Sequence, residues 1–213
     1  MTLPYGQPGA RLARGAPAER ELVRALQRDL RRLGYLRGGL DGRFGAETER
    51  AVRALQHDFL VNDGRGQDGP APVALRDSNR GRIAAADGVV DDRLAACIED
   101  LLEDPRIPPL PRSDDPEGDN RQVLSTLRLL EVPEVPRPFL FAILRQESGL
   151  LHFRVPTQAD PDDFIVVGLD RNDRTRPDRI TSRGYGVGQF TLFHHPPTRE
   201  EVEAVMLDPA RNV

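Results

Sequence analysis

The sequence predicts a mainly α-helical protein with two domains, a small three-helix bundle followed by a second helical domain. Three observations support this fold class. Leucines recur at helical spacing from residue 18 onward, prolines cluster in residues 105–119 near the middle of the chain, and an apolar segment, residues 139–144, follows that cluster. A length of 213 residues suits two domains of about 100 residues each.

The first predicted helix begins at Ala18 and ends before Gly34. Pro17 suits the first turn of a helix, and a glycine in the left-handed conformation commonly ends one. The residues between them carry one apolar face, formed by Leu22, Val23, Leu26, Leu30 and Leu33. Residues 1–16 are rich in Gly, Pro and Arg, and we expect them to form a flexible arm.

Two further helices are expected in the first domain, at residues 47–60 and 91–103. The third helix follows from a weak internal repeat, because the Asp41-Gly42 pair recurs as Asp87-Gly88 and the apolar residues after each pair align. In this alignment Cys97 lies on an apolar helix face and is expected to be a buried thiol. Residues 62–82 are polar and rich in glycine, so a loop is expected there.

The second half of the chain begins after the proline-rich segment 105–119, which is expected to be a linker. A helix at residues 120–130 precedes the apolar segment, residues 150–183 are expected to form a long loop rich in Asp and Arg, and a last helix begins at Arg199. The sequence therefore predicts four parts: the arm, 1–16; a first domain, 17–104; the linker, 105–119; and a second domain, 120–213.

Composition excludes several classes of function. All basic residues are Arg, so lysine Schiff-base chemistry and a phosphate-binding loop that needs Lys are excluded. A pI near 5.6 with interspersed charges argues against nucleic acid as a partner, and no apolar run reaches the ~18 residues of a membrane span. Cys97 is the single cysteine of the chain. His194 and His195 are neighbours in the sequence, are expected in a surface turn and lack the spacing of a zinc pair. Neither a metal nor a cofactor is therefore expected.

One motif set lies in the first domain. It runs through Val23–Gln27, Leu33-Gly34-Tyr35, Leu40–Gly45, Thr48 and Ala51–Gln56. In order and spacing it resembles the bacterial peptidoglycan-binding domain, a small three-helix module. The resemblance implies that peptidoglycan is the partner and that the glycine-rich turn binds it, with Tyr35, Asp41, Gly42 and Phe44 as the wall-binding residues. The alternative is that these four residues only shape the turn and fill the core.

A second motif set lies in the second domain. Residues 142–149 form an apolar helix that ends in Glu147-Ser148-Gly149, a glycine-rich turn at 182–191 closes on Gln189, and Asp208-Pro-Ala-Arg-Asn212 follows. These three motifs, in this order, resemble the lytic transglycosylases of the lysozyme-like superfamily. The resemblance implies a lysozyme-like helical domain that cleaves the MurNAc–GlcNAc strands of peptidoglycan and leaves 1,6-anhydro-MurNAc ends.

The same resemblance implies a role for each site residue. Glu147 acts as general acid and then as base, and we expect it to be partly shielded from water, which would keep it protonated near neutral pH. Ser148 would orient or bind the substrate. The cleft would be lined by the remaining residues: Gly184 and Gly186, which let the sugar approach the backbone, with Tyr185 and Gln189.

Two other functions remain open at this point. A hydrolytic muramidase, as in a phage endolysin, needs a second carboxylate, which one of the aspartates between Asp160 and Asp173 could supply. A non-catalytic wall-binding protein is the other. Action at the bacterial cell wall is expected in each case; residues 1–17 lack the apolar core of a signal peptide, and the export route stays open.

The resemblance also predicts helices beyond Asn212, including one that would present a Tyr to the cleft. We therefore expect that a further polypeptide segment, a partner chain or a rearranged Arg/Asp-rich insertion completes the cleft, and that residues 1–213 alone have weak activity or none. An unfinished helical domain would leave apolar side chains exposed, namely Phe139, Phe141, Ile143 and Leu144.

Overall fold

The computed structural model describes residues 2–65, 73–133, 135–193 and 195–213. The protein is mainly helical, as predicted, with a small three-stranded antiparallel sheet in the order β1-β2-β3. The helices and strands are α1 (Arg20–Arg32), α2 (Ala46–Val61), α3 (Asp92–Glu103), α4 (Pro116–Leu129), α5 (Arg137–Ser148), β1 (Val167–Asp170), β2 (Ser182–Tyr185), β3 (Phe190–Phe193) and α6 (Arg199–Glu201), with short helical turns η1 (Pro4–Gly6), η2 (Leu75–Ser78) and η3 (Val202–Met206).

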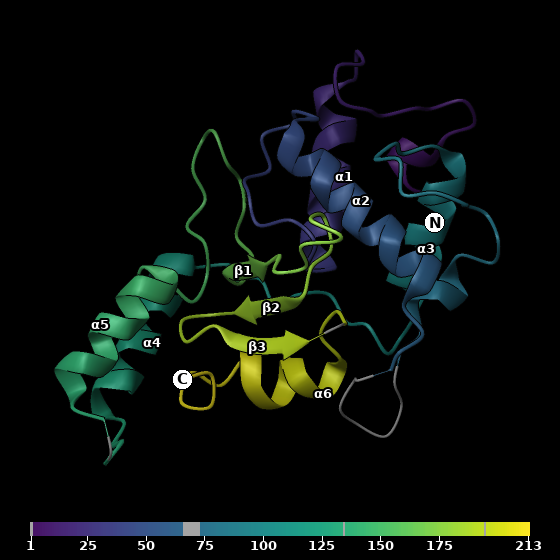
Figure 1. Ribbon diagram of the computed structural model, residues 1–213. Helices are drawn as coiled ribbons and strands as arrows, with labels where there is room; N and C mark the ends of the chain where they lie inside the picture. Colours follow the sequence, from purple (N-terminus) through teal and green to yellow (C-terminus); the bar gives the residue numbers. More distant parts are fainter. Residues whose placement is uncertain (1, 66–72, 134, 194) are drawn as a thin grey trace.

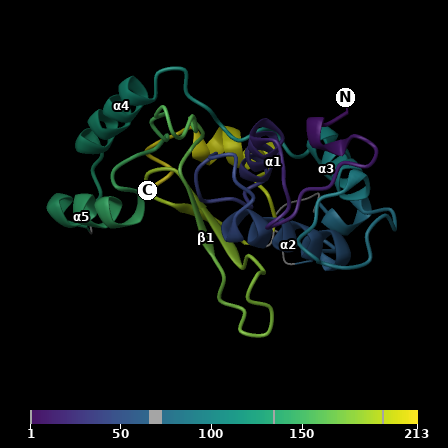
Figure 2. The ribbon, with the colours of Figure 1, turned by 90° about the horizontal axis from the view of Figure 1, so that it is seen from above.

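The sheet lies between two groups of helices. Figures 1 and 2 show α1, α2 and α3 on one side of it and the α4–α5 pair on the other. Residue Tyr185 of β2 stands opposite Val167 of β1 and Phe190 of β3 in the two antiparallel ladders. The C-terminus ends beside this sheet (Figure 1).

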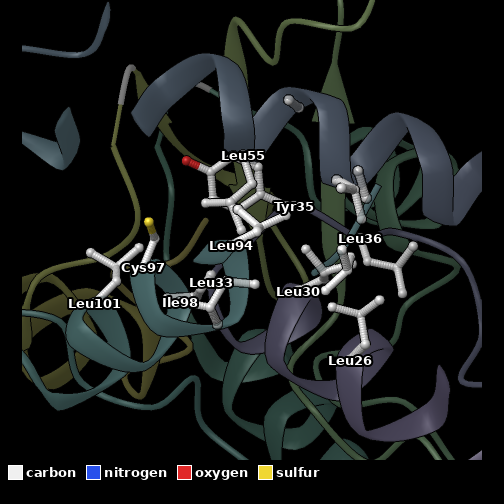
Figure 3. Packing of buried hydrophobic residues seen from close by; sticks show 14 of the residues in the cluster. Leu26, Leu30, Leu33, Tyr35, Leu36, Leu55, Leu94, Cys97, Ile98 and Leu101 are labelled. Atoms are coloured by element: carbon white, nitrogen blue, oxygen red, sulfur yellow. The ribbon is translucent and has the colours of Figure 1, made fainter. Parts of the chain in front are cut away.

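The three predicted helices of the first half form one apolar core, shown in Figure 3. Leu26 and Leu30 of α1, and Leu33 directly after it, are fully buried in this core, which confirms the face predicted from the leucine spacing. Cys97 of α3 is also fully buried there, as predicted. Burial of a leucine stabilises the fold by about 1.5–3 kcal/mol, so this face is what fixes α1 against its neighbours.

The predicted internal repeat exists as a repeated hydrogen-bond pattern. The Gln27 side-chain amide donates to Asp41 Oδ1 at 2.9 Å and its carbonyl accepts from the Gly42 N–H at 2.8 Å. Gln56 makes the same pair of bonds to Asp87 and Gly88, at 2.7 and 2.8 Å. Both glycines have positive φ, +71° and +76°, a conformation that side chains strongly disfavour.

Residues 2–16 are packed against the helices instead of forming the flexible arm expected. Tyr5 in η1 is fully buried and its hydroxyl donates to Asp29 Oδ2 at 2.6 Å. Leu12 pairs with Val90 in an antiparallel bridge. The expectation of a flexible arm rested on the glycines, prolines and arginines of the segment. Its few large apolar side chains are buried, and they hold it against the helices.

The expected loop and the expected linker also contain packed residues. Within 62–82, residues 66–72 lie outside the described residues, but Leu75 of η2 is fully buried in the core of the first half. Within 105–119, Ile107 and Leu110 are buried, and α4 already begins at Pro116. Pro116 occupies the first turn of α4, and the segment before it is packed against the rest of the protein. Residues 105–119 therefore do not act as a spacer between two separate domains.

Residues 150–183 form part of a second core rather than one long loop. They supply β1 and the buried side chains of Phe153, Phe164 and Ile165, which pack with Tyr185 of β2. A third apolar cluster joins α4 and α5 and includes Leu140 and Leu144. On the outer side of α5, Phe139 is 60% exposed and Ile143 is 39% exposed, whereas Leu144 is buried and Phe141 half-buried.

Two buried arginines join the halves of the protein. Arg183 of β2 is completely buried and its Nε donates to the Gly34 carbonyl at 3.0 Å, immediately after α1. Arg31 of α1 forms a salt bridge of 3.0 Å with Asp162, and both side chains are fully buried. Because removing one partner of a buried ion pair costs about 3–5 kcal/mol, these contacts make the two halves one packed unit.

Candidate functional site

A groove of about 480 Å³ lies where the end of α5, strand β1 and the first half of the chain meet. It contains three residues predicted for the cleavage site, Glu147, Ser148 and Gln189. The first half supplies Arg37, Gly38 and Glu47. The remaining lining residues are Gln146, Gly149, Arg154, Val166, Val167 and Gly168. The charged residues of the groove are two arginines and two glutamates, which suits a polar ligand.

The C-terminal end of α5 positions Glu147. Leu140 and Leu144 anchor the inner face of the helix, and Gly149 ends it in the left-handed conformation, with φ at +67°. The Ser148 hydroxyl donates to the Leu144 carbonyl at 3.0 Å, so it closes the last helical turn. The Glu147 side chain is exposed, so the shielding from water expected for it is absent from the structure.

Gln189 holds its side chain across the glycines of the sheet. Its Nε2 donates to the Gly186 carbonyl at 2.7 Å. Its Oε1 lies so near Gly168 and Gly184 that a Cβ on either glycine would come within 2.1 and 2.7 Å of it. Gly184 therefore makes room for a side chain of the protein and not for a sugar, which corrects its predicted role.

Gly186 and Tyr185 also differ from their predicted roles. A Cβ on Gly186 would lie 2.7 Å from both Asn212 Oδ1 and His152 Cε1, so protein atoms occupy that space. Tyr185 is fully buried beside Gly34, and burial raises the pKa of its phenol. Neither residue lines the groove. The prediction failed because the glycines indicated an exposed turn, whereas residues 182–185 form the middle strand of the sheet and are largely buried.

The second and third predicted motifs are in direct contact through Asn212. Its amide Nδ2 donates to the Tyr185 carbonyl at 2.9 Å, and its Oδ1 accepts from the Gly188 N–H at 2.9 Å. The first motif joins them through Val187, which is buried in the apolar cluster of Leu140 and Leu144. The tertiary structure thus gathers the three motifs at one place.

The wall-binding residues predicted in the first half separate into two groups. Tyr35 is fully buried and its hydroxyl donates to Asp58 Oδ2 at 2.5 Å, so it belongs to the core and cannot bind a ligand at the surface. Asp41 is exposed, but its carboxylate accepts from Gln27 and from the Arg43 N–H, which shapes the turn. The aromatic ring expected on the binding surface is therefore not that of Tyr35.

Gly42 and Phe44 line a second depression, of about 380 Å³. Arg20 and Arg43 stand beside them, and the others are Ala16, Ala18 and Val23. Phe44 is half-buried, with part of its ring against the core. Arg43 could have been predicted from the sequence, because it lies between the predicted residues Gly42 and Phe44. Nothing in the sequence pointed to Arg20, which the fold brings to this depression from the start of α1.

The aspartates expected to offer a second carboxylate are engaged elsewhere. Asp162 is buried between Arg31 and Arg154, each at 3.0 Å, and Asp163 forms a salt bridge of 2.5 Å with Arg112. Asp160 pairs with Arg154 at 3.0 Å. No aspartate of the described residues lines the groove, which contains the carboxylates of Glu47 and Glu147.

His195 is buried, contrary to the surface turn expected, and contacts Glu201 at 3.5 Å; His194 lies outside the described residues. In the part of the chain that the structure describes, no group of three or more His, Cys, Asp or Glu side chains is placed to hold a metal ion. Nor does any helix described in the structure have the length and apolar character needed to cross a membrane.

Comparison with known proteins adds one finding. Residues 19–65 match the family model described as a putative peptidoglycan binding domain, which spans α1, the glycine-rich turn and α2. No curated protein and no solved structure matches the chain. The match supports peptidoglycan as the partner of the first half and the cell wall as its place of action.

Proposed function

We propose that this protein binds peptidoglycan through its first half and cleaves the MurNAc–GlcNAc strands in the groove at Glu147, as a lytic transglycosylase. The observation that carries the proposal is the meeting of Glu147, Ser148 and Gln189 in one groove. Ser148 and Gln189 come from two motifs and lie about forty positions apart in the sequence. Arg37, Gly38 and Glu47 of the first half line the same groove, which supports a cleavage site beside the peptidoglycan-binding fold.

The chemistry begins with Glu147 as the proton donor. Its proton passes to the glycosidic oxygen, the bond from that oxygen to C1 of MurNAc breaks, and positive charge develops on the sugar ring. The 6-hydroxyl of the same sugar then attacks C1, and Glu147 takes up the hydroxyl proton. A 1,6-anhydro ring closes, and the enzyme returns to its starting protonation state without consuming water.

The exposure of Glu147 bears on when it can act. The general acid must hold a proton until the glycosidic oxygen is in place. A glycan strand lying in the groove would cover this side chain and remove water from it, which favours the protonated form. Bound substrate would therefore supply the shielding that Glu147 lacks in the free protein.

The test is mass spectrometry of the soluble products released from purified peptidoglycan by the full chain. Because residues of the first half line the groove, we expect this chain to cleave the glycan and leave 1,6-anhydro-MurNAc ends, in place of the weak activity or none expected from the sequence. Glu147→Gln should lower the rate by about 10²–10⁴-fold, since proton transfer supplies that factor. Glu117→Gln, an exposed glutamate on α4 away from the groove, is the matched control and should cleave normally. Reducing ends would identify a hydrolase, and the absence of any released product would contradict cleavage altogether.

A further inference from the structure

A second carboxylate lines the proposed cleavage groove, and it comes from the wall-binding half of the protein. Glu47 lies in the first turn of α2, and both it and Glu147 border the same groove of about 480 Å³. Within the described residues, Glu47 forms neither a hydrogen bond nor a salt bridge, so its oxygens are available to a ligand. Of the glutamates and aspartates in the structure, these two are the ones that the groove brings together.

The turn that carries Gly38 fixes the place of this carboxylate. A Cβ on Gly38 would lie 2.3 Å from Glu47 Oε2, so the carboxylate rests directly on the glycine backbone. The buried guanidinium of Arg31 donates to the carbonyls of Arg37 and Gly38, and Leu40 N–H donates to Asp160 at 3.1 Å. The groove wall under Glu47 is therefore held by side chains from both halves.

Glu47 stands at the positive end of its helix. It occupies the first turn of α2, where the helix dipole stabilises an anion. Burial and the charge of Arg50 lower the pKa of the Arg171 guanidinium, and the Glu47 carboxylate counteracts that shift. Glu147, by contrast, stands at the C-terminal end of α5, where the dipole disfavours an anion.

A charge-separated pair of this kind fits glycosidic bond cleavage. One carboxyl group must hold a proton for the leaving oxygen, and a second, ionised one stabilises the positive charge on the sugar ring. We propose that Glu47 is the second carboxylate of the cleavage site and that it contacts the MurNAc ring of the bound strand.

Glu47 neither gains nor loses a proton in this reaction. The proton of Glu147 goes to the leaving oxygen together with the electron pair of the broken bond, and the proton of the 6-hydroxyl returns to Glu147. The wall-binding half then serves as one wall of the cleavage site as well as an anchor. This inference rests on the proposed function, since it assigns a role within the same reaction.

The test compares Glu47→Gln with Glu49→Gln in the full chain, on purified peptidoglycan. Glu49 is two residues along the same helix, outside the groove, and pairs with Arg14 and Arg53 at the surface. We expect Glu47→Gln to lower kcat by roughly 10²-fold, with KM and sedimentation on insoluble peptidoglycan unchanged, because the charge acts on the transition state. Glu49→Gln should keep the wild-type kcat.

Glu47→Asp provides a second measurement. This variant keeps the negative charge but moves it back by one methylene, so its kcat should fall between those of the wild type and Glu47→Gln. If Glu47→Gln does not fold, a wild-type kcat in Glu47→Asp would overturn the inference. Wild-type kcat in Glu47→Gln, beside an inactive Glu147→Gln, would overturn the role of Glu47 alone. Full activity in both Gln variants would overturn the proposed function as well.

Discussion

The guanidinium carbon of Arg183 lies 4.5 Å from the centroid of the Tyr35 ring. Arg183 belongs to the glycine-rich turn motif of the second half, and Tyr35 belongs to the wall-binding motif of the first. Both side chains are fully buried, and Asp58 lies between them, accepting from the Tyr35 hydroxyl at 2.5 Å and standing 3.5 Å from the guanidinium. The two motif sets therefore share one buried polar cluster at the boundary between the halves.

This cluster predicts that Arg183 cannot be replaced by Lys. A lysine ammonium cannot lie flat on the Tyr35 ring, and its single nitrogen does not reproduce the two separate nitrogens with which Arg183 contacts the Gly34 carbonyl and Asp58. We expect Arg183→Lys to lower the free energy of unfolding by about 3 kcal/mol, measured by urea denaturation. The exposed Arg199→Lys on α6 is the control and should shift it by no more than about 0.5 kcal/mol. Equal stability of the two variants would contradict the role of the buried cluster.

Stability should depend on the protonation of His152. Burial lowers the pKa of this imidazole from 6.5 to about 4, and its Nδ1 accepts from the Val187 N–H at 3.2 Å. The unfolded chain binds the proton more readily between those two values, so the folded state loses stability as the pH falls from 6.5 to 4. The full loss is about 3 kcal/mol, at 1.36 kcal/mol per pH unit.

The measurement is the urea midpoint at pH 7 and at pH 5. We expect a higher midpoint at pH 7 for the wild type and a smaller difference for His152→Gln, which keeps an acceptor but does not titrate. The half-buried His57→Gln controls for the general effect of losing a histidine. An unchanged pH dependence in His152→Gln would show that another group is responsible.

Wall binding should depend on Phe44 and not on the hydroxyl of Tyr35. Phe44 lines the depression beside Gly42 and Arg43, whereas Tyr35 is buried in the core. Losing an aromatic contact of about 1 kcal/mol should weaken sedimentation on peptidoglycan by roughly fivefold in Phe44→Ala. Tyr35→Phe should lower the melting temperature but sediment as the wild type does. The reverse pattern would place the binding surface elsewhere.

Residues 1–104 should sediment with peptidoglycan but melt at a lower temperature than the full chain. Nearly all of the core of the first half lies within this fragment, which favours folding. The fragment loses Asp162 and Arg183, the buried partners of Arg31 and Asp58, and also loses Ile107 and Ile180 from the core. Cellulose is the control for unspecific retention on insoluble glycan. A fragment with the melting temperature of the full chain would mean that the contacts between the halves add nothing to stability.

The sequence by itself determined the helices of the first half, because their cores are made by periodic apolar faces. The spacing of Leu26, Leu30 and Leu33 predicts the apolar face at α1, and the repeated Asp-Gly pairs predict two equivalent turns. It also singled out Glu147 and Gln189, which the fold places in one groove. The helix faces and the turns depend on residues close together in the chain, which is what periodicity reports, whereas Glu147 and Gln189 were found through the motif resemblance.

The tertiary structure alone decided which residues face the groove and which are buried beneath it. Tyr35 and Tyr185 belong to the interior, and Arg37 and Glu47 belong to the site, although no spacing in the sequence distinguishes them. Their placement follows from the packing of the sheet against α1 and α2, where buried arginines need acceptors from the other half of the chain. Contacts between segments more than a hundred residues apart satisfy that need, and a pattern within one segment does not record them.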